Sequence, residues 1–296
     1  MATVQDLKRR IRSVGNTEKI TKAFELVASA RLRRAESRIA AMRPYADRML
    51  ELMGVTAQAA GSVRLPLLER REEVTRVALL PITADRGLAG AFNAQVLRRA
   101  FALERELRGE GIDVKWLASG RRGRSTLTFR RYELIQAWQG FSERPDYADA
   151  QAIARRAADL YATHEVDRVV IVYNRYKSPL VQVVTVQDLL PIPEKVIEGG
   201  EEDAKEAALL GDFIYEPEPE QILERLLPVY VETELYRALL ESAASEQGAR
   251  MTAMRNASKN AGELIANLTL AMNRARQAEI TQEILEVVAG ADALTA

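Results

Sequence analysis

The chain has 296 residues, of which 47% are hydrophobic and 28% are charged, so it is long enough for one or two domains with a buried core. The absence of cysteine excludes disulfides, thiol catalysis and cysteine-ligated metals, and a single histidine, His164, excludes a histidine cluster. Forty-two basic and 42 acidic side chains cancel, so the net charge of zero does not indicate a nucleic-acid partner.

The charges are unevenly distributed along this neutral chain. Residues 1–50 hold 12 Lys/Arg against 5 Asp/Glu, whereas residues 188–225 hold 3 against 12. No apolar run approaches the roughly 20 residues that a membrane helix needs, and the N-terminal residues lack a signal-peptide pattern. We therefore expect a soluble protein that meets any membrane only through partners.

Residues 1–58 are predicted to form one long helix. Thr3 and Asp6 have the spacing of a capping box, with Asp in place of the usual Glu or Gln. Apolar residues then recur about every 3.5 positions, with a slip around residues 15–17, at Val4, Leu7, Ile11, Val14, Ile20, Phe24, Val27, Leu32, Ala35, Ile39, Met42 and Met49. We expect the helix to be kinked or interrupted near Pro44.

Residues 72–190 have the pattern of a small α/β domain. Helical patterns alternate with short apolar strands, which favours a Rossmann-like, largely parallel sheet inserted between two terminal helices. The expected strands are residues 74–80, 112–117, 168–173 and 180–186, and the expected helices are 92–107 and 146–163, with a basic helix or loop at 120–131. A turn at residues 177–179 indicates that the last strand is antiparallel.

Residues 191–219 are rich in Pro, Gly and acidic side chains and are expected to form an exposed connector. Residues 220–296 then predict a second long helix, kinked or restarted at Pro228. Its small and apolar residues alternate at spacings of four and three, at Ala257, Ala261, Leu264, Leu268, Ala271, Ala275, Ala278, Gln282, Leu285 and Ala289. This heptad seam predicts an antiparallel coiled coil with the first helix, and the alternative is a coiled-coil homodimer.

Two places in the middle domain have residues suited to chemistry. The turn from Gly87 to Gly90 follows a strand and precedes a helix, a position that suits a phosphate site, but it lacks the lysine and hydroxyl of a nucleotide-binding loop. A structural turn, pinned by an ion pair between Asp85 and Arg86, is the simpler interpretation. The other place is a basic patch with nearby Trp116 and Phe129 for stacking, formed by Lys115, Arg121, Arg122, Arg124, Arg130 and Arg131.

Simpler interpretations hold for that patch and for two other charged segments. A solvated helix face accounts for the basic patch, and a solvated loop accounts for the acidic run at residues 198–203, whose spacing is irregular for a metal site. The basic face of the first helix suits either solvent or acidic partner loops.

The last turns of the second helix have an apolar tip, which covers about half of the helix circumference. The tip comprises Ile280, Ile284, Leu285, Val287 and Val288. The second helix exceeds the first by about ten residues, so in an antiparallel pair this tip lacks a partner within the chain. An apolar surface of this kind predicts a socket on another protein.

Four segments of the chain together resemble the gamma subunit family of F-type ATP synthase. They are NTEKITKAFELVASARLRRAE at residues 16–36, TADRGLAG at 83–90, IYEPEPEQIL at 214–223, and the closing stretch from SEQGARMTAMRNASKNAGELI to ARQAEITQEILEVVAGADAL. The resemblance spans the whole chain and is weakest between about residues 100 and 190.

The resemblance implies a non-catalytic central-stalk rotor, with one copy per complex and no cofactor. Its coiled coil would turn inside a hexamer of alpha and beta subunits, and its α/β domain would rest on the membrane c-ring beside the epsilon subunit. The implied beta-subunit contacts are Lys19, Lys22, Phe24, Arg276, Gln277, Thr281 and Glu283, with Phe24 replacing the methionine of many members. The implied contacts to the c-ring or epsilon are Phe213, Tyr215 and Glu216.

The implied location is the cytoplasmic face of the bacterial plasma membrane, as a peripheral subunit that turns as ions cross the membrane. Two other classes of function stay open at this point. One is a coiled-coil scaffold whose α/β head binds an anionic ligand or nucleic acid at residues 115–131. The other is a small α/β enzyme that uses the turn at residues 85–90.

Overall fold

A computed structural model of the chain describes residues 3–61, 65–193, 196 and 216–295. The chain forms two compact units. One unit combines the first and last parts of the chain, residues 1–28 and 251–296, and the other comprises residues 29–250. We call these the terminal unit and the central unit.

Two long helices contribute to both units. Helix α1 spans Val4–Ala60 and α6 spans Pro219–Thr295. The capping box is present at the start of α1, where the Asp6 backbone N–H donates to Thr3 Oγ1 at 3.2 Å and the Thr3 backbone N–H donates to Asp6 Oδ2 at 3.4 Å. Proline begins α6, as suits a first helical position whose N–H lacks an intrahelical partner. Neither helix is interrupted at its internal proline, Pro44 or Pro228.

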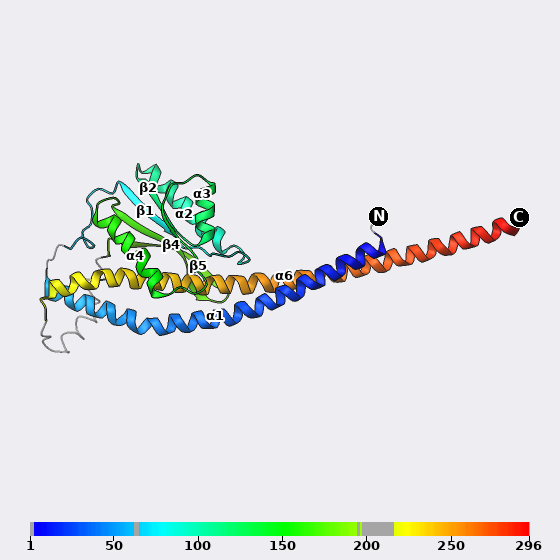
Figure 1. Ribbon diagram of the computed structural model, residues 1–296, viewed down its shortest axis with the longest axis horizontal. Helices are drawn as coiled ribbons and strands as arrows, with labels where there is room; N and C mark the ends of the chain where they lie inside the picture. Colours follow the sequence, from blue (N-terminus) through cyan, green and yellow to red (C-terminus); the bar gives the residue numbers. More distant parts are fainter. Residues whose placement is uncertain (1–2, 62–64, 194–195, 197–215, 296) are drawn as a thin grey trace. The chain divides into compact units, whose positions relative to one another are not determined.

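The central unit is built on a five-stranded sheet with the order β3-β2-β1-β4-β5 (Figure 1). Strands β1 to β4 are parallel neighbours, and β5 pairs antiparallel with β4, as the predicted hairpin requires. The elements in chain order are β1 Arg76–Pro81, α2 Phe92–Gly109, β2 Asp113–Ser119, α3 Arg121–Phe129, β3 Leu134–Trp138, α4 Tyr147–Ala162, β4 Arg168–Ser178 and β5 Val181–Leu190.

The two faces of the sheet are both covered, which explains the continuous apolar runs of β1 and β4. On one face, Val77 and Leu79 pack with Val96 of α2 and Leu127 of α3. On the other face, Ala78 and Leu80 belong to a cluster with α4 and with the parts of α1 and α6 that lie in this unit, including Ile153, Leu160, Met49, Met53, Leu227 and Leu235. Alternate residues of one strand thus supply two cores.

A buried carboxylate fixes the entry into β1. Asp167 Oδ2 accepts the backbone N–H groups of Thr75 and Arg76, each at 2.9 Å, and the Thr75 hydroxyl at 2.8 Å. Burial by itself raises the pKa of Asp167, but these hydrogen bonds and the Arg76 charge outweigh it and hold the pKa below its usual value. The ionised carboxylate therefore ties β1 to the start of β4.

The predicted fold class is confirmed: terminal helices flank a mixed α/β domain with a mostly parallel sheet. One strand, β3, was not predicted. Its residues are only half-buried apart from exposed Gln136, so the segment lacks the strong apolar run of a central strand. The 120–131 segment, left open between helix and loop, is the helix α3.

Candidate functional site

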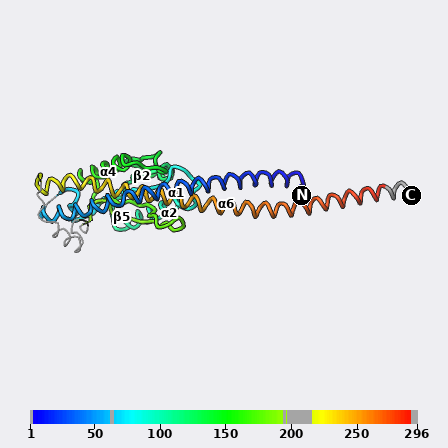
Figure 2. The backbone as a smooth tube through the Cα atoms, turned by 90° about the horizontal axis from the view of Figure 1, so that it is seen from below, coloured from blue at the N-terminus to red at the C-terminus, as the bar shows by residue number. Residues whose placement is uncertain are grey.

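In the terminal unit, α1 and α6 form an antiparallel pair whose seam follows a heptad. Thr21 Oγ1 lies 2.7 Å from Ser258 Oγ, and Glu25 accepts a hydrogen bond from Arg255 Nε at 3.0 Å. A later residue of α1 thus contacts an earlier residue of α6, as antiparallel helices require. Figures 1 and 2 show the same two segments side by side. On α1, positions 4, 7, 11, 14, 18, 21, 25 and 28 are buried or half-buried and alternate at spacings of three and four, with Asp6 and Gly15 half-buried beside them.

The predicted register of this seam was wrong by one position in part of each helix. The seam of α1 holds Thr21, Glu25 and Ala28, whereas the predicted residues Ile20, Phe24 and Val27 are exposed. On α6, positions 254, 258, 261, 265, 268, 272 and 275 are buried or half-buried at heptad spacing, and Ile265 and Met272 are half-buried where the predicted Leu264 and Ala271 are exposed. Apolar side chains therefore face outward while polar groups pair inside.

Glu25 is the centre of a charged cluster in this seam. Lys22 Nζ lies 3.0 Å from Glu25 Oε2, and Arg255 Nε lies 3.0 Å from Glu25 Oε1. The hydrogen bonds from Lys22 and then Arg255 lower the pKa of Glu25, against a smaller effect of burial. Of the predicted partner contacts on α1, Lys22 is thus held by its own helix, while Lys19 and Phe24 are exposed.

The end of α6 is exposed over its whole circumference. Every residue from Arg276 to Gly290 is exposed, including all five residues of the predicted apolar tip, from Ile280 at 47% to Val287 at 72%. In Figure 2 this segment continues past the first residues of α1 within the terminal unit. The predicted contacts Arg276 and Glu283 make no hydrogen bond or ion pair with the residues that the structure describes. Thr281 donates to the Gln277 carbonyl at 2.8 Å.

The edge of the sheet where parallel α/β folds bind ligands is filled by the protein itself. The carboxyl ends of β1 and β4 form a topological switch point, the usual ligand crevice of open parallel sheets. Here the remaining cavity is about 10 Å³, scarcely enough for one water molecule. Its lining includes Ile82, Thr83 and Ser119 from the sheet region and Leu239, Ser242 and Glu246 from α6.

The turn at Gly87–Gly90 is a structural turn beside this edge. Leu88 and Gly90 have positive φ angles of 63° and 56°, and a Cβ at Gly87 would lie 2.8 Å from the Arg122 guanidinium. The predicted ion pair between Asp85 and Arg86 is wrong. Asp85 accepts the backbone N–H groups of Arg121, Gly140 and Ser142 at 2.8–3.0 Å, and Arg86 lies 3.8 Å from Glu143. Asp85 therefore joins three loops through hydrogen bonds to backbone N–H groups.

Of the two aromatic rings predicted to give the basic patch at residues 115–131 a stacking surface, only Phe129 is accessible. Trp116 is 1% exposed and lies within a core cluster of rings, with Phe101 and Tyr132 at centroid distances of 5.6 and 5.2 Å. Phe129 is exposed, and the Arg130 guanidinium lies over the Phe101 ring at 4.4 Å. The arrangement matches a solvated helix face.

The remaining candidates fall partly outside the described residues. Phe213, Tyr215 and the acidic run at 198–203 lie there, and Glu216 is described and exposed. Within the described part of the chain, no group of three or more His, Asp or Glu side chains is placed to hold a metal ion. No helix in that part is long and apolar enough to cross a membrane.

Comparison with known proteins gives full-length matches. A family model described as ATP synthase matches residues 3–294. The ATP synthase gamma chain of Rubrobacter xylanophilus is 48% identical over 296 residues, which is all of both chains. That of Moorella thermoacetica is 45% identical over 294 residues, covering 99% of this chain and all of the relative. The chain belongs to the ATP synthase gamma chain family.

Solved structures of ATP synthases contain chains with a similar fold. A chain from the central stalk and c-ring structure of the Tetrahymena thermophila mitochondrial ATP synthase is 28% identical, with a TM-score of 0.58, and the match covers 81% of this chain and 99% of that one. A chain of the Euglena gracilis ATP synthase rotor matches with a TM-score of 0.66 at 18% identity, covering 94% and 98%. The family predicted from the sequence is confirmed, and the expected central-stalk role agrees with it.

Proposed function

We propose that this chain is the central-stalk rotor subunit of an F-type ATP synthase and that it transmits ion-driven rotation of a membrane c-ring to the catalytic beta subunits. Membership of the gamma chain family supports the role. The observation that carries the mechanism is the fully exposed segment from Arg276 to Gly290 with its apolar tip. The chain itself carries no catalysis in this scheme, which agrees with the filled crevice of its sheet.

The apolar tip would turn inside a socket formed by alpha and beta subunits. Apolar contacts suit a bearing because they are non-directional, whereas a strong ion pair at one angle would hold the shaft there. Polar contacts to beta would be exposed groups such as Lys19, Arg276 and Glu283. Exposed ion pairs contribute only about 0–1 kcal/mol each, enough to favour an orientation and too little to arrest rotation.

The outward apolar residues of α1 would add a second contact to beta. Phe24 is exposed beside Ile20 and Val27, since the seam is filled by Thr21, Glu25 and Ala28. A ring at this position offers apolar area to a moving partner without a fixed hydrogen bond. Lys22 would contribute less than Lys19, because Glu25 already holds its ammonium group at 3.0 Å.

At the other end, Phe213, Tyr215 and Glu216 would contact the c-ring or the epsilon subunit, with one rotor copy in each complex. The assembly would sit on the cytoplasmic face of a bacterial plasma membrane, with this chain held there through its partners. Replacing Tyr215 and Glu216 by Ala should reduce proton-coupled ATP synthesis while sparing ATP hydrolysis by the soluble head. Equal loss of both activities would contradict this placement.

Assembly with alpha and beta tests the bearing directly. The triple variant Ile280→Ser/Ile284→Ser/Leu285→Ser should co-elute poorly with the alpha and beta subunits, because full burial of each side chain contributes about 1.5–3 kcal/mol. The control variant Glu279→Ser/Glu286→Ser changes exposed polar residues of the same segment and should assemble normally. Circular dichroism checks that helix content is equal. Normal assembly of the triple variant would refute the bearing.

A further inference from the structure

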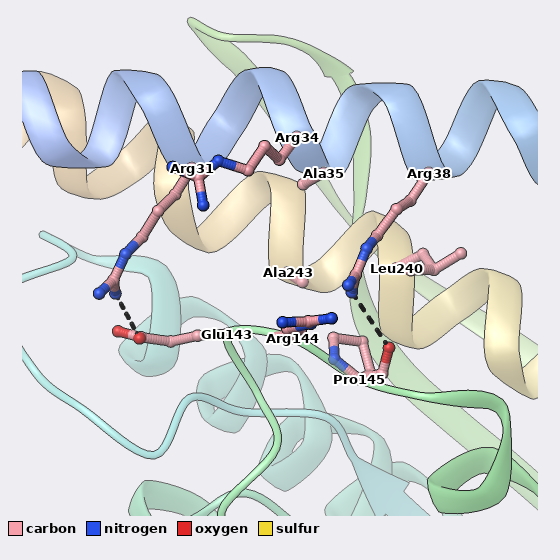
Figure 3. A pocket seen from close by; sticks show the side chains of 9 residues that line it. All are labelled: Arg31, Arg34, Ala35, Arg38, Glu143, Arg144, Pro145, Leu240 and Ala243. Carbon is pink, nitrogen blue, oxygen red and sulfur yellow. Dashed lines mark hydrogen bonds and ion pairs between the residues drawn. The ribbon is translucent and has the colours of Figure 1, made fainter.

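A basic cavity lies in the central unit, where α1, α6 and the loop before α4 meet (Figure 3). Its volume is about 430 Å³, within the range of small-molecule sites. The lining residues are Arg31, Arg34, Ala35, Arg38, Glu143, Arg144, Pro145, Leu240 and Ala243. It lies apart from the helix ends discussed above and adjoins the filled crevice of the sheet, with which it shares Pro145.

Charge in the lining is strongly unbalanced, with four arginines and a single carboxylate. Arg31 forms an ion pair with Glu143. The same carboxylate is shared with Arg250 at 3.5 Å and Arg86 at 3.8 Å, so it neutralises little of the charge on the lining. Arg38 donates to the Pro145 carbonyl at 3.5 Å, which positions its guanidinium without neutralising it (Figure 3).

Two of these arginines differ from the others in their contacts. The side chains of Arg34 and Arg144 make no hydrogen bond or ion pair with the residues that the structure describes, although both line the cavity. Four guanidinium groups around one hollow repel one another, and the repulsion grows as water is excluded. Arg34 and Arg144 are exposed, so water solvates their guanidinium groups, and an anion with several charges would replace that water and reduce the repulsion.

Shape and chemistry together narrow the class of anion. The guanidinium group is a planar fork that binds phosphate oxygens with two parallel hydrogen bonds. The apolar part of the lining consists of small or aliphatic residues, Ala35, Pro145, Leu240 and Ala243, and offers no aromatic ring to stack on a base. The cavity would therefore recognise phosphate groups. Several linked phosphates match its separate guanidinium groups better than a single phosphate does.

We propose that this cavity binds an oligophosphate group, meaning two or three linked phosphoryl units, carried either by an inorganic oligophosphate or by a nucleoside di- or triphosphate. The four arginines bind the phosphate oxygens, and Leu240 and Ala243 of α6 form the floor. An acidic peptide is the competing occupant. A docked peptide helix lies along an extended apolar groove, whereas this cavity is a compact hollow with four apolar residues.

Isothermal titration calorimetry of the full-length chain with sodium tripolyphosphate, at low ionic strength, tests the proposal. Parallel titrations use pyrophosphate, ADP, ATP and a glutamate-rich peptide. The variant Arg34→Gln/Arg144→Gln removes the two unpartnered guanidinium groups. The matched control Arg33→Gln/Arg98→Gln removes two exposed charges of the central unit that do not line the cavity.

Saturable tripolyphosphate binding is expected, and the cavity variant should weaken it about tenfold or more, since charge-assisted hydrogen bonds are being removed. The control variant should bind within about twofold of the original chain, because only screened long-range charge is lost. If the chain binds tripolyphosphate at least as tightly as ATP, the ligand is an inorganic oligophosphate, because the nucleoside adds nothing to the affinity. If the chain binds ATP more tightly, the ligand is a nucleotide. No saturable binding, equal weakening in both variants, or binding of the peptide alone would overturn the proposal.

Discussion

The α/β domain and the end of α6 use apolar residues in opposite ways. In the sheet, Val77, Leu79 and Leu80 are fully buried, and helices cover both faces. In the last turns of α6, Ile284, Leu285 and Val287 are more than half exposed. Equally apolar sequence thus builds a closed core in one region and an open surface in the other.

This difference separates the residues that stabilise the fold from the residues available to bind another protein. The α/β domain packs around buried clusters within the central unit, and residues of α6 line what remains of its ligand crevice. The end of α6 adds no buried area within the described residues, so its apolar side chains have value only in a complex. Substitutions in the two regions should therefore act on different measurements.

The largest effect on stability is expected in the domain core. Leu127→Ala removes a fully buried side chain that packs with α2 and the sheet, and cavities of this kind cost about 2–5 kcal/mol. Urea unfolding followed by tryptophan fluorescence measures the loss. A change under about 1 kcal/mol would mean that this face of the sheet is not the closed core described here.

A somewhat smaller effect is expected at Asp167. Asp167→Ala leaves three donors without an acceptor, and the loss should be about 2–4 kcal/mol at neutral pH. Because folding lowers the pKa of Asp167, its contribution is present above the unfolded value and is lost as pH falls through the folded value. The stability gap between the two proteins should therefore narrow below about pH 4.

The matched control for Asp167 is Asp113→Asn, which changes an exposed carboxylate at the start of β2. Its unfolding free energy should follow that of the original chain at every pH. A gap for Asp167→Ala that widens in acid would reverse the sign argued for this carboxylate.

A weaker contribution is expected from the charged cluster in the helix pair. A double-mutant cycle with Glu25→Gln and Arg255→Gln should give a coupling of about 0.5–1 kcal/mol, since the arginine is 57% exposed and the pair is partly screened. The pKa of Glu25 is lowered by folding, so the coupling should vanish as pH falls through that lowered value. Thermal unfolding of α-helical structure, with and without added salt, measures it.

The smallest effect on stability is expected at the apolar tip. Ile284→Ser should change the unfolding free energy of the isolated chain by less than about 0.5 kcal/mol, because the side chain is 57% exposed. Urea unfolding under the conditions used for Leu127→Ala gives the comparison. A loss comparable to that of Leu127→Ala would show that the tip is packed within the chain, contrary to the contrast drawn above.

The sequence predicted the helix pair well and its register less well. Small residues recur at heptad spacing along the second helix, and this spacing made the coiled coil itself predictable. The phase was misread at Ile20, Phe24 and Val27, because hydrophobicity alone does not distinguish a seam residue from one reserved for a partner. Besides local hydrogen bonds to Glu18 and Lys22, the polar seam residues Thr21 and Glu25 bond to Ser258 and Arg255, more than two hundred residues away, and no local pattern contains those partners.

Other features depended on contacts that no local pattern contains. Asp85 and Arg86 are adjacent, which suggested an ion pair, but the fold brings three distant backbone N–H groups to Asp85 and places Glu143 near Arg86. The arginine cavity combines a helix face with Arg144, over a hundred residues later in the chain. The exposed tip, by contrast, was predictable from the excess length of the second helix.

The central claim, that the chain turns as one shaft within a larger complex, can be tested by direct observation of rotation. Since the chain has no cysteine, a single cysteine introduced at exposed Glu110 provides a unique attachment point for a bead. In complexes with alpha and beta subunits fixed to a surface, ATP should drive stepwise rotation of the bead in one direction. A bead that keeps a fixed orientation while the same complexes hydrolyse ATP would contradict the account.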